Sequence, residues 1–150
     1  MRDELSTLPT NDIPTYSIGT VARMLGISVY TLRMYEREGL VLSHKAATTH
    51  RLYSPSDVER LKCIRHAITE EKLSIAGIRK IFSMIPCWDI VDCSDANRKK
   101  CPAFLGHAAP CWSHDHKHNA CAKADCRSCK VYKLSSDCDQ IKASITNLSR

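Results

Sequence analysis

The fold is decided by residues 28–39, which read Ser-Val-Tyr-Thr-Leu-Arg-Met-Tyr-Glu-Arg-Glu-Gly. Ser28 is a favourable N-cap, and Gly39 supplies the positive φ with which helices commonly end. The stretch predicts one short helix, because Leu32 and Tyr35 are three positions apart and can face a core. The side chains left to face outward are those of Tyr30, Thr31, Arg33, Met34 and Arg37. Such a mixture of hydroxyls, aromatic ring and guanidinium groups suits a DNA groove.

The segment before this helix follows the same pattern. Ser17 is an N-cap, Gly26 is a terminator, and apolar residues recur between them with the i, i+3, i+4, i+7 spacing of an amphipathic helix. Two short helices joined at residues 26–28 predict a helix-turn-helix whose second helix reads DNA. A plain pair of packing helices fits the spacing equally well.

Four motifs in order carry a resemblance to a known family. They are Tyr-Ser-Ile-Gly at 16–19, Leu-Gly-Ile-Ser at 25–28, Thr-Leu-Arg-Met-Tyr-Glu-Arg-Glu-Gly-Leu at 31–40 and Arg-Leu-Tyr-Ser at 51–54. Together they resemble the bacterial MerR family of transcriptional regulators, and the Tyr-Glu-Arg-Glu-Gly run is most similar to its heat-shock-repressor branch. The resemblance covers residues 15–86 and implies a winged helix that binds promoter DNA as a dimer.

A hairpin is expected after the second helix. Short apolar strands at 40–42 and 51–53 flank a polar loop, and in the family this hairpin is the wing that touches DNA backbone. The loop lacks the Gly usual there. Positive or polar side chains in and beside this loop could contact the phosphates of the DNA backbone. The predicted DNA-binding residues are Ser17, Ser28, Tyr30, Thr31, Arg33, Tyr35, Arg37, Lys45, His50, Arg51 and Tyr53.

Two more helices complete this domain. Ser54 and the following Pro open a third helix, with an apolar stripe from Val58 to Ile68. A fourth helix runs from a cap at Ser74 to about residue 85, where Pro86 ends it. In most of the family a long dimerisation helix follows at this point, whereas here a cysteine-rich region begins.

Composition places the chain among soluble proteins. It has 150 residues, a net charge of +6, 43% hydrophobic and 25% charged residues. No apolar run approaches 18 residues and the N-terminus has no signal-peptide pattern, so we expect a cytoplasmic protein without membrane contact. The mildly basic charge permits nucleic-acid binding without demonstrating it.

Nine cysteines are the most unusual feature, and eight of them follow residue 86. In a cytosolic chain such a cluster favours metal binding or redox chemistry over structural disulfides. The pairs Cys87-Trp88 and Cys111-Trp112 resemble a cysteine-rich module with paired Cys-Trp motifs found in bacterial signalling proteins, spanning residues 87–132. That resemblance adds a domain boundary rather than a mechanism.

Seven of these cysteines are predicted to bind metal, since the region has too few aliphatic residues for a large core. Cys126 and Cys129 are separated by two residues, the spacing of a zinc knuckle. With Cys111 and Cys121 as the completing pair, they would form one metal site. Cys87, Cys93 and Cys101 could form a second site with one further ligand. Zinc is the first choice of cofactor and an iron–sulfur cluster the alternative. His114, His116 and His118 are interpreted as part of a solvated loop.

A short heptad pattern closes the chain. Leu134, Cys138, Ile141, Ile145 and Leu148 alternate spacings of four and three. Two heptads fall short of a secure coiled coil, so a dimer seam and a helix packed on its own chain are equal alternatives.

The sequence thus predicts a mainly α protein. Its expected parts are a disordered arm at 1–14, a winged helix-turn-helix domain at 15–86, a small metal-stabilised cysteine-rich region at 87–132, and a C-terminal helix at 133–150 that could dimerise. We expect a transcriptional regulator rather than an enzyme, binding double-stranded promoter DNA as a homodimer and acting on RNA polymerase indirectly. Two alternatives remain for the cysteines: a purely structural metal module, or a thiol oxidoreductase, which lacks the βαβ pattern expected around Cys126 and Cys129.

Overall fold

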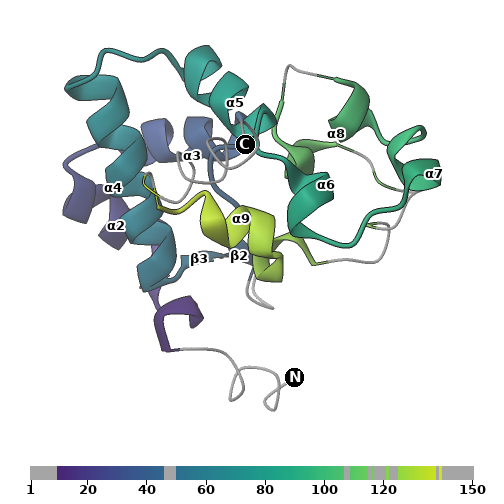
Figure 1. Cartoon of the computed structure of the whole chain (residues 1–150). Coiled ribbons are helices and arrows are strands. Elements are labelled where there is room, and N and C mark those ends of the chain that lie inside the picture. Colours follow the sequence, from purple (N-terminus) through teal and green to yellow (C-terminus); the bar gives the residue numbers. More distant parts are fainter. Residues whose placement is uncertain are drawn as a thin grey trace. The chain divides into compact units, whose positions relative to one another are not determined.

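The computed structural model describes residues 10–45, 50–106, 109–114, 116, 121, 125–137 and 139. It is mainly α-helical, as predicted (Figure 1). The chain divides into two compact units, residues 1–65 and 66–150, which are described one at a time below. In the part of the chain that is described, no helix has the length and apolar character required to cross a membrane.

The predicted helix-turn-helix is present in the first unit. Helix α2 (Ile18–Leu25) begins at the Ser17 cap and helix α3 (Val29–Arg37) at the Ser28 cap. Gly26 joins them with a φ of 66°, and the backbone N–H of Ile27 donates to the carbonyl of Ala22 at 3.0 Å. These are the contacts of a Schellman turn, which lets α3 start within three residues of the end of α2.

Helix α3 also ends as predicted. Gly39 has a φ of 74°, and the N–H of Leu40 donates to the carbonyl of Tyr35 at 2.9 Å. Leu40 and Val41, which follow, are fully buried. The helix therefore stops in a left-handed turn that directs the chain into the core.

A three-stranded sheet lies beside these helices in the order β1-β3-β2. Strand β3 (Arg51–Tyr53) pairs antiparallel with β1 (Tyr16–Ser17) and with β2 (His44–Lys45). The strand expected at 51–53 is confirmed, but the one expected at 40–42 is wrong, because its partner strand begins at His44. Residues 40 and 41 pack in the core instead, and the Leu40 carbonyl accepts a hydrogen bond from Nε of the buried Arg60 at 2.7 Å.

Helix α4 (Pro55–Thr69) starts at a reciprocal cap. The N–H of Ser54 donates to Oδ2 of Asp57 at 2.9 Å, and the N–H of Asp57 donates to Oγ of Ser54 at 3.1 Å. Both residues are buried, so this capping box satisfies donors that water cannot reach. Leu61 and Ile64 on the predicted stripe are buried as well.

The segment before β1 is partly structured. A 3-10 turn, η1 (Thr10–Asp12), is joined to the start of α4 by a hydrogen bond of 2.8 Å from Oγ of Ser56 to Oδ1 of Asp12. This anchors the end of the segment that was expected to be a disordered arm. Residues 1–9 of that segment lie outside the described residues.

The second unit consists of short helices. They are α5 (Ile75–Ser83), α6 (Cys87–Ile90), α7 (Asp95–Arg98), α8 (Pro102–Leu105), η2 (Cys111–Ser113), η3 (Cys126–Ser128) and α9 (Lys130–Leu134). Ser74 caps α5 as predicted, with Oγ accepting from the N–H of Gly77 at 3.0 Å.

Aromatic rings form much of the second unit's core. Trp112 lies 5.5 Å from Phe82 of α5 and 5.2 Å from Tyr132 of α9, measured between ring centroids. Trp88 and Phe104 pack edge to face at 4.9 Å. The two Cys-Trp tryptophans therefore serve as packing centres, which compensates for the scarcity of aliphatic residues.

Helix α9 ends at Leu134, the first residue of the predicted heptad seam. The other seam residues, Cys138, Ile141, Ile145 and Leu148, lie outside the described residues. The dimer seam remains a prediction from sequence.

Candidate DNA-binding surface and cysteine cavity

The outward face of α3 carries the side chains expected to meet DNA. Arg33 and Arg37 are exposed, and Tyr30 is 69% exposed. The guanidinium carbon of Arg37 lies 5.7 Å from the centroid of the Tyr30 ring, which is cation–π distance. One face of a single helix thus presents two cations and a phenol to solvent.

The two predicted serines act first as helix caps. Oγ of Ser28 accepts from the N–H of Thr31 at 3.0 Å, and Oγ of Ser17 accepts from the N–H of Thr20 at 3.3 Å. Both serines are exposed, so a hydroxyl and the positive end of a helix dipole lie together at the surface at the start of each helix.

Two predicted DNA contacts lie in the core instead. Tyr35 is 2% exposed and Tyr53 is 0% exposed. The hydroxyl of Tyr35 accepts a hydrogen bond of 3.3 Å from Nη1 of Arg65 on α4. These positions correct the expectation for both tyrosines, because burial against α4 and the sheet leaves their rings no path to a DNA groove.

The wing is tied to α3 by Glu36. Its carboxylate accepts a hydrogen bond from Oγ of Ser43 and lies 2.5 Å from Nε of Arg51 in an ion pair. Arg51 stands opposite Lys45 in the β2–β3 register, and His50 next to it is exposed. The tip of the wing, residues 46–49, lies outside the described residues.

Sequence reasoning missed Glu36 and Arg60 as positioning residues. Glu36 belongs to the quoted Tyr-Glu-Arg-Glu run, but a single acidic residue on a helix gives no sign of its partners. Arg60 lies on the apolar side of α4 and has no exposed surface. Because a fully buried arginine needs a partner, an arginine within an apolar stripe is a sequence signal that could have identified it as a positioning residue.

The seven cysteines predicted to bind metal all line one cavity of about 40 Å³ in the second unit. All seven are free thiols, and Cys101 is 7% exposed while the other six are half-buried. The cysteines are Cys87, Cys93, Cys101, Cys111, Cys121, Cys126 and Cys129. The two Cys-Trp motifs begin two groups of cysteines, Cys87 to Cys101 and Cys111 to Cys129, which are called the two halves of the repeat. They were expected to form separate sites, but both groups face a common space.

The thiols are close enough to influence one another's protonation. A hydrogen bond between the side chains of Cys87 and Cys111 lowers the pKa of Cys87 and, together with burial, raises the pKa of Cys111. Burial, reinforced by neighbouring thiols, raises the pKa of Cys93, Cys121 and Cys126. A metal ion that binds here must displace protons from these sulfurs.

Among the described residues, no three cysteine, histidine or carboxylate side chains are grouped as the ligands of one metal. The chemistry of the donor set, thiolates with a nearby imidazole, nevertheless suits zinc or an iron–sulfur cluster.

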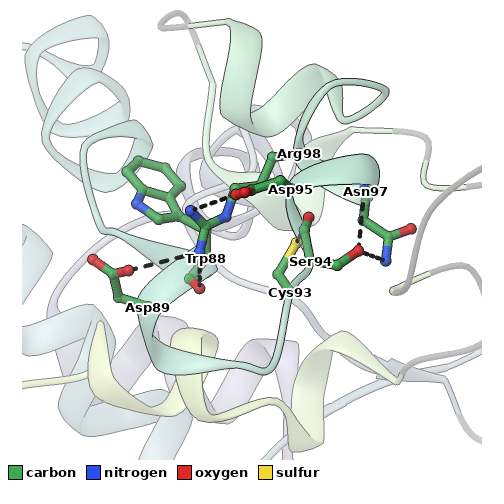
Figure 2. A network of polar contacts seen from close by, with 7 residues as sticks. All are labelled: Trp88, Asp89, Cys93, Ser94, Asp95, Asn97 and Arg98. Atoms are coloured by element: carbon green, nitrogen blue, oxygen red, sulfur yellow. Dashed lines mark hydrogen bonds and ion pairs between the residues drawn. The ribbon is translucent and has the colours of Figure 1, made fainter.

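Arg98 lies at the centre of a network of polar contacts that includes the cavity-lining residues Trp88 and Cys93 (Figure 2). Its Nη2 donates to the carbonyl of Trp88 at 3.3 Å and lies 4.0 Å from Oδ1 of Asp89, while Nη1 lies 3.4 Å from Oδ1 of Asp95. Ser94, which caps α7, follows Cys93 directly. Arg98 thus joins α6 to α7 and fixes the loop that carries Cys93.

The chain was compared with known proteins. Residues 16–85 match the family model described as MerR HTH family regulatory protein. The chain is 36% identical over 75 residues, half of each protein, to the putative heat shock protein HspR of Streptomyces coelicolor.

Two further relatives align over a similar length. The chain is 38% identical over 71 residues to the HTH-type transcriptional regulator ZntR of Escherichia coli K12, which covers 46% of this chain and 49% of ZntR. It is 28% identical over 88 residues, 58% of each protein, to the mercuric resistance operon regulatory protein of Pseudomonas fluorescens. The chain thus spans about half the length of the curated relatives it matches.

Proposed function

We propose that the protein is a transcriptional regulator of the MerR type that binds promoter DNA through α3, because residues 16–85 match the MerR family model. The observation that carries the proposal is the exposed face of α3, where Arg33, Arg37 and Tyr30 point to solvent from a capped helix. An arginine on such a helix can bind O6 and N7 of guanine with both guanidinium nitrogens. Arg33 is therefore the proposed base-reading residue.

The remaining surface residues are proposed to position the domain on the DNA backbone. Exposed hydroxyls at Ser17 and Ser28, and basic groups at His50 and Arg51, are of the kind that contacts phosphate oxygens. Because Glu36 is bound to Ser43 and Arg51, the wing and α3 are expected to approach DNA as one rigid surface. Thr31, Arg37 and Lys45 complete the proposed set.

Regulation is proposed to require two copies of the chain. One helix-turn-helix reads one half-site, and a two-fold dimer reads a pseudo-palindromic operator with useful affinity. A dimer that bends or untwists its promoter can alter RNA polymerase activity without changing its base contacts.

The effector is proposed to act at the cysteine cavity. Seven free thiols around one space can respond to a metal or to the redox state. The second candidate is a structural role, in which metal supports the fold without sensing. Operator affinity measured with and without bound zinc distinguishes the two, because only a sensor should change its affinity.

The DNA-binding proposal is tested with Arg33→Ala. An operator is first selected from a random duplex library, and gel shifts are then run at fixed salt. We expect a loss of about 1–3 kcal/mol in binding free energy, roughly 5- to 150-fold in affinity. The control is Lys62→Ala, which removes the same charge from an exposed position on α4 where Lys62 pairs with Glu59. Equal affinities for the two variants would remove Arg33 from the interface.

A further inference from the structure

The seven cysteines form one ligand set rather than two. A tetrahedral ion takes four ligands, so two independent sites would divide the thiols into two groups, each surrounding its own centre. Instead, Cys87 and Cys93 of the first half line the same cavity as Cys126 and Cys129 of the second. Its volume of about 40 Å³ exceeds the roughly 10–15 Å³ that a single water requires.

The number of ligands argues against a single ion, because seven cysteines and one histidine line the cavity and one tetrahedral ion takes only four ligands. With zinc–sulfur bonds of about 2.3 Å, the sulfurs of one tetrahedral site lie only about 4 Å apart. Four sulfurs at that spacing complete one coordination sphere, which leaves three of the seven cavity thiols without a place on the same ion. A guest with several metal atoms, joined by bridging sulfur, would reach thiolates that stand farther apart.

His116 lines the same cavity and is oriented as a ligand. Its Nε2 lies 2.6 Å from the carbonyl oxygen of Cys111, and a carbonyl can only accept, so Nε2 carries the proton. In the neutral ring the lone pair is then on Nδ1, which lies 3.9 Å from Sγ of Cys101. Metal-binding histidines typically donate their other ring N–H in this way, which fixes the tautomer and the ring orientation.

We propose that the cavity is a single polynuclear metal site, bound by thiolates from both halves of the repeat and by Nδ1 of His116. This rests on the proposed function only in that the cysteine cavity is the effector region. The thiols lose their protons on binding, and the metal is recognised as a soft, thiolate-preferring cation. The bound group is either a zinc–thiolate cluster or an iron–sulfur cluster.

The experiment uses the full chain, purified anaerobically and stripped with a chelator. One portion is titrated with zinc alone and another with ferric iron, sulfide and a thiol reductant, and metal per chain is measured by elemental analysis with optical spectra. We expect at least two metal ions per chain in one arm, with visible absorption only if the iron arm is the loaded one. One metal ion per chain or none in both arms would overturn the proposal.

Two substitutions test whether the halves share the site. Cys87→Ser and Cys126→Ser should each reduce the metal content of the whole site, to fewer than half the ions of the unsubstituted chain. If each variant loses only one ion and keeps the other at full affinity, the sites are independent and the proposal fails.

His116→Ala should lower metal affinity at least tenfold. The matched control is His114→Ala, because His114 also contacts a backbone carbonyl, that of Ala109 at 3.2 Å, but does not line the cavity. His116→Cys, which restores a soft ligand but not the imidazole contact, should regain most of the affinity. Equal losses for the two alanine variants, or no rescue by cysteine, would assign His116 a structural role only.

Gel shifts on the same preparations separate this inference from the proposed function. A chain that binds its operator but takes up no metal defeats the metal site alone. A chain that binds several metal ions but no DNA defeats the regulatory function alone.

Discussion

At the scale of single residues, the tyrosines of α3 differ sharply in environment. Tyr30 is 69% exposed and stacks with Arg37, whereas Tyr35 is 2% exposed and accepts a hydrogen bond from Arg65. Five positions on a helix of 3.6 residues per turn correspond to about 140° of rotation, so the two rings leave on nearly opposite sides. One ring is available to DNA, and the other holds α3 against the core.

This contrast predicts opposite phenotypes for two alanine variants. Tyr30→Ala should leave the free energy of unfolding within about 0.5 kcal/mol, as exposed substitutions usually do, and weaken operator binding about fivefold. Tyr35→Ala should lower the free energy of unfolding by about 3–5 kcal/mol, because it empties a buried aromatic site. Urea titration by circular dichroism and gel shifts measure the two effects. A stable Tyr35→Ala chain with impaired DNA binding would return Tyr35 to the interface.

At the scale of elements, the turn between α4 and α5 carries unusual backbone geometry. Lys72 has a φ of 59°, the one positive φ found at a non-glycine residue in the described part of the chain. Its Nζ donates to the carbonyl of Thr69 at 2.7 Å, which closes the end of α4. A side chain in this left-handed region is strained by roughly 1–2 kcal/mol relative to glycine.

We therefore expect Lys72→Gly to raise the free energy of unfolding or leave it unchanged. The expected gain is at most about 1 kcal/mol once the lost Nζ hydrogen bond is subtracted. The matched control is Lys80→Gly, the same substitution at an exposed position inside α5, which should cost about 1 kcal/mol. Thermal melting of both variants shows whether each substitution raises or lowers the stability. Destabilisation by equal amounts would mean that the Nζ contact outweighs the backbone strain at position 72.

At the scale of the whole molecule, the segment that matches the family model and the compact units have different limits. The family model matches residues 16–85, yet the second compact unit begins at residue 66. Phe82 of α5 lies 5.5 Å from Trp112 of the cysteine-rich region, so the last helix of the segment that matches the family model shares a core with that region. The boundary predicted at residue 86 lies inside that unit.

Dimerisation is a prediction from the sequence that also concerns the whole molecule. The usual long helix is absent after α5, where Pro86 and Cys87 follow, and the heptad residues after Leu134 are the sequence's alternative. Ile141→Glu with Ile145→Glu should give a monomer that keeps its metal and loses tight operator binding, since burying an isoleucine in a dimer seam would contribute roughly 1.5–3 kcal/mol.

Sedimentation measures the outcome of this double substitution. Ala143→Glu with Asn147→Glu is the control, because it adds the same two charges at positions that the heptad spacing turns away from the seam. A dimeric Ile141/Ile145 variant that still binds its operator would assign dimerisation to the cysteine-rich region.

The sequence by itself determined the features that depend on neighbours along the chain. The caps at Ser17, Ser28 and Ser74 and the stop at Gly39 were predicted correctly, because a cap needs only a hydroxyl or a glycine within a few residues of the helix end. The exposed positions of Arg33 and Tyr30 followed from helical periodicity alone.

Only the tertiary structure decided what depends on residues far apart. Tyr53 on the central strand β3 is fully buried, and residues 40 and 41 lie in the core, where Arg60, twenty positions later, donates to the Leu40 carbonyl. Cysteine spacing suggested two separate sites, whereas packing around Trp112 brings all seven thiols and His116 to one cavity. Local propensity acts over a few residues, but a cavity is formed by contacts between segments that no sequence period connects.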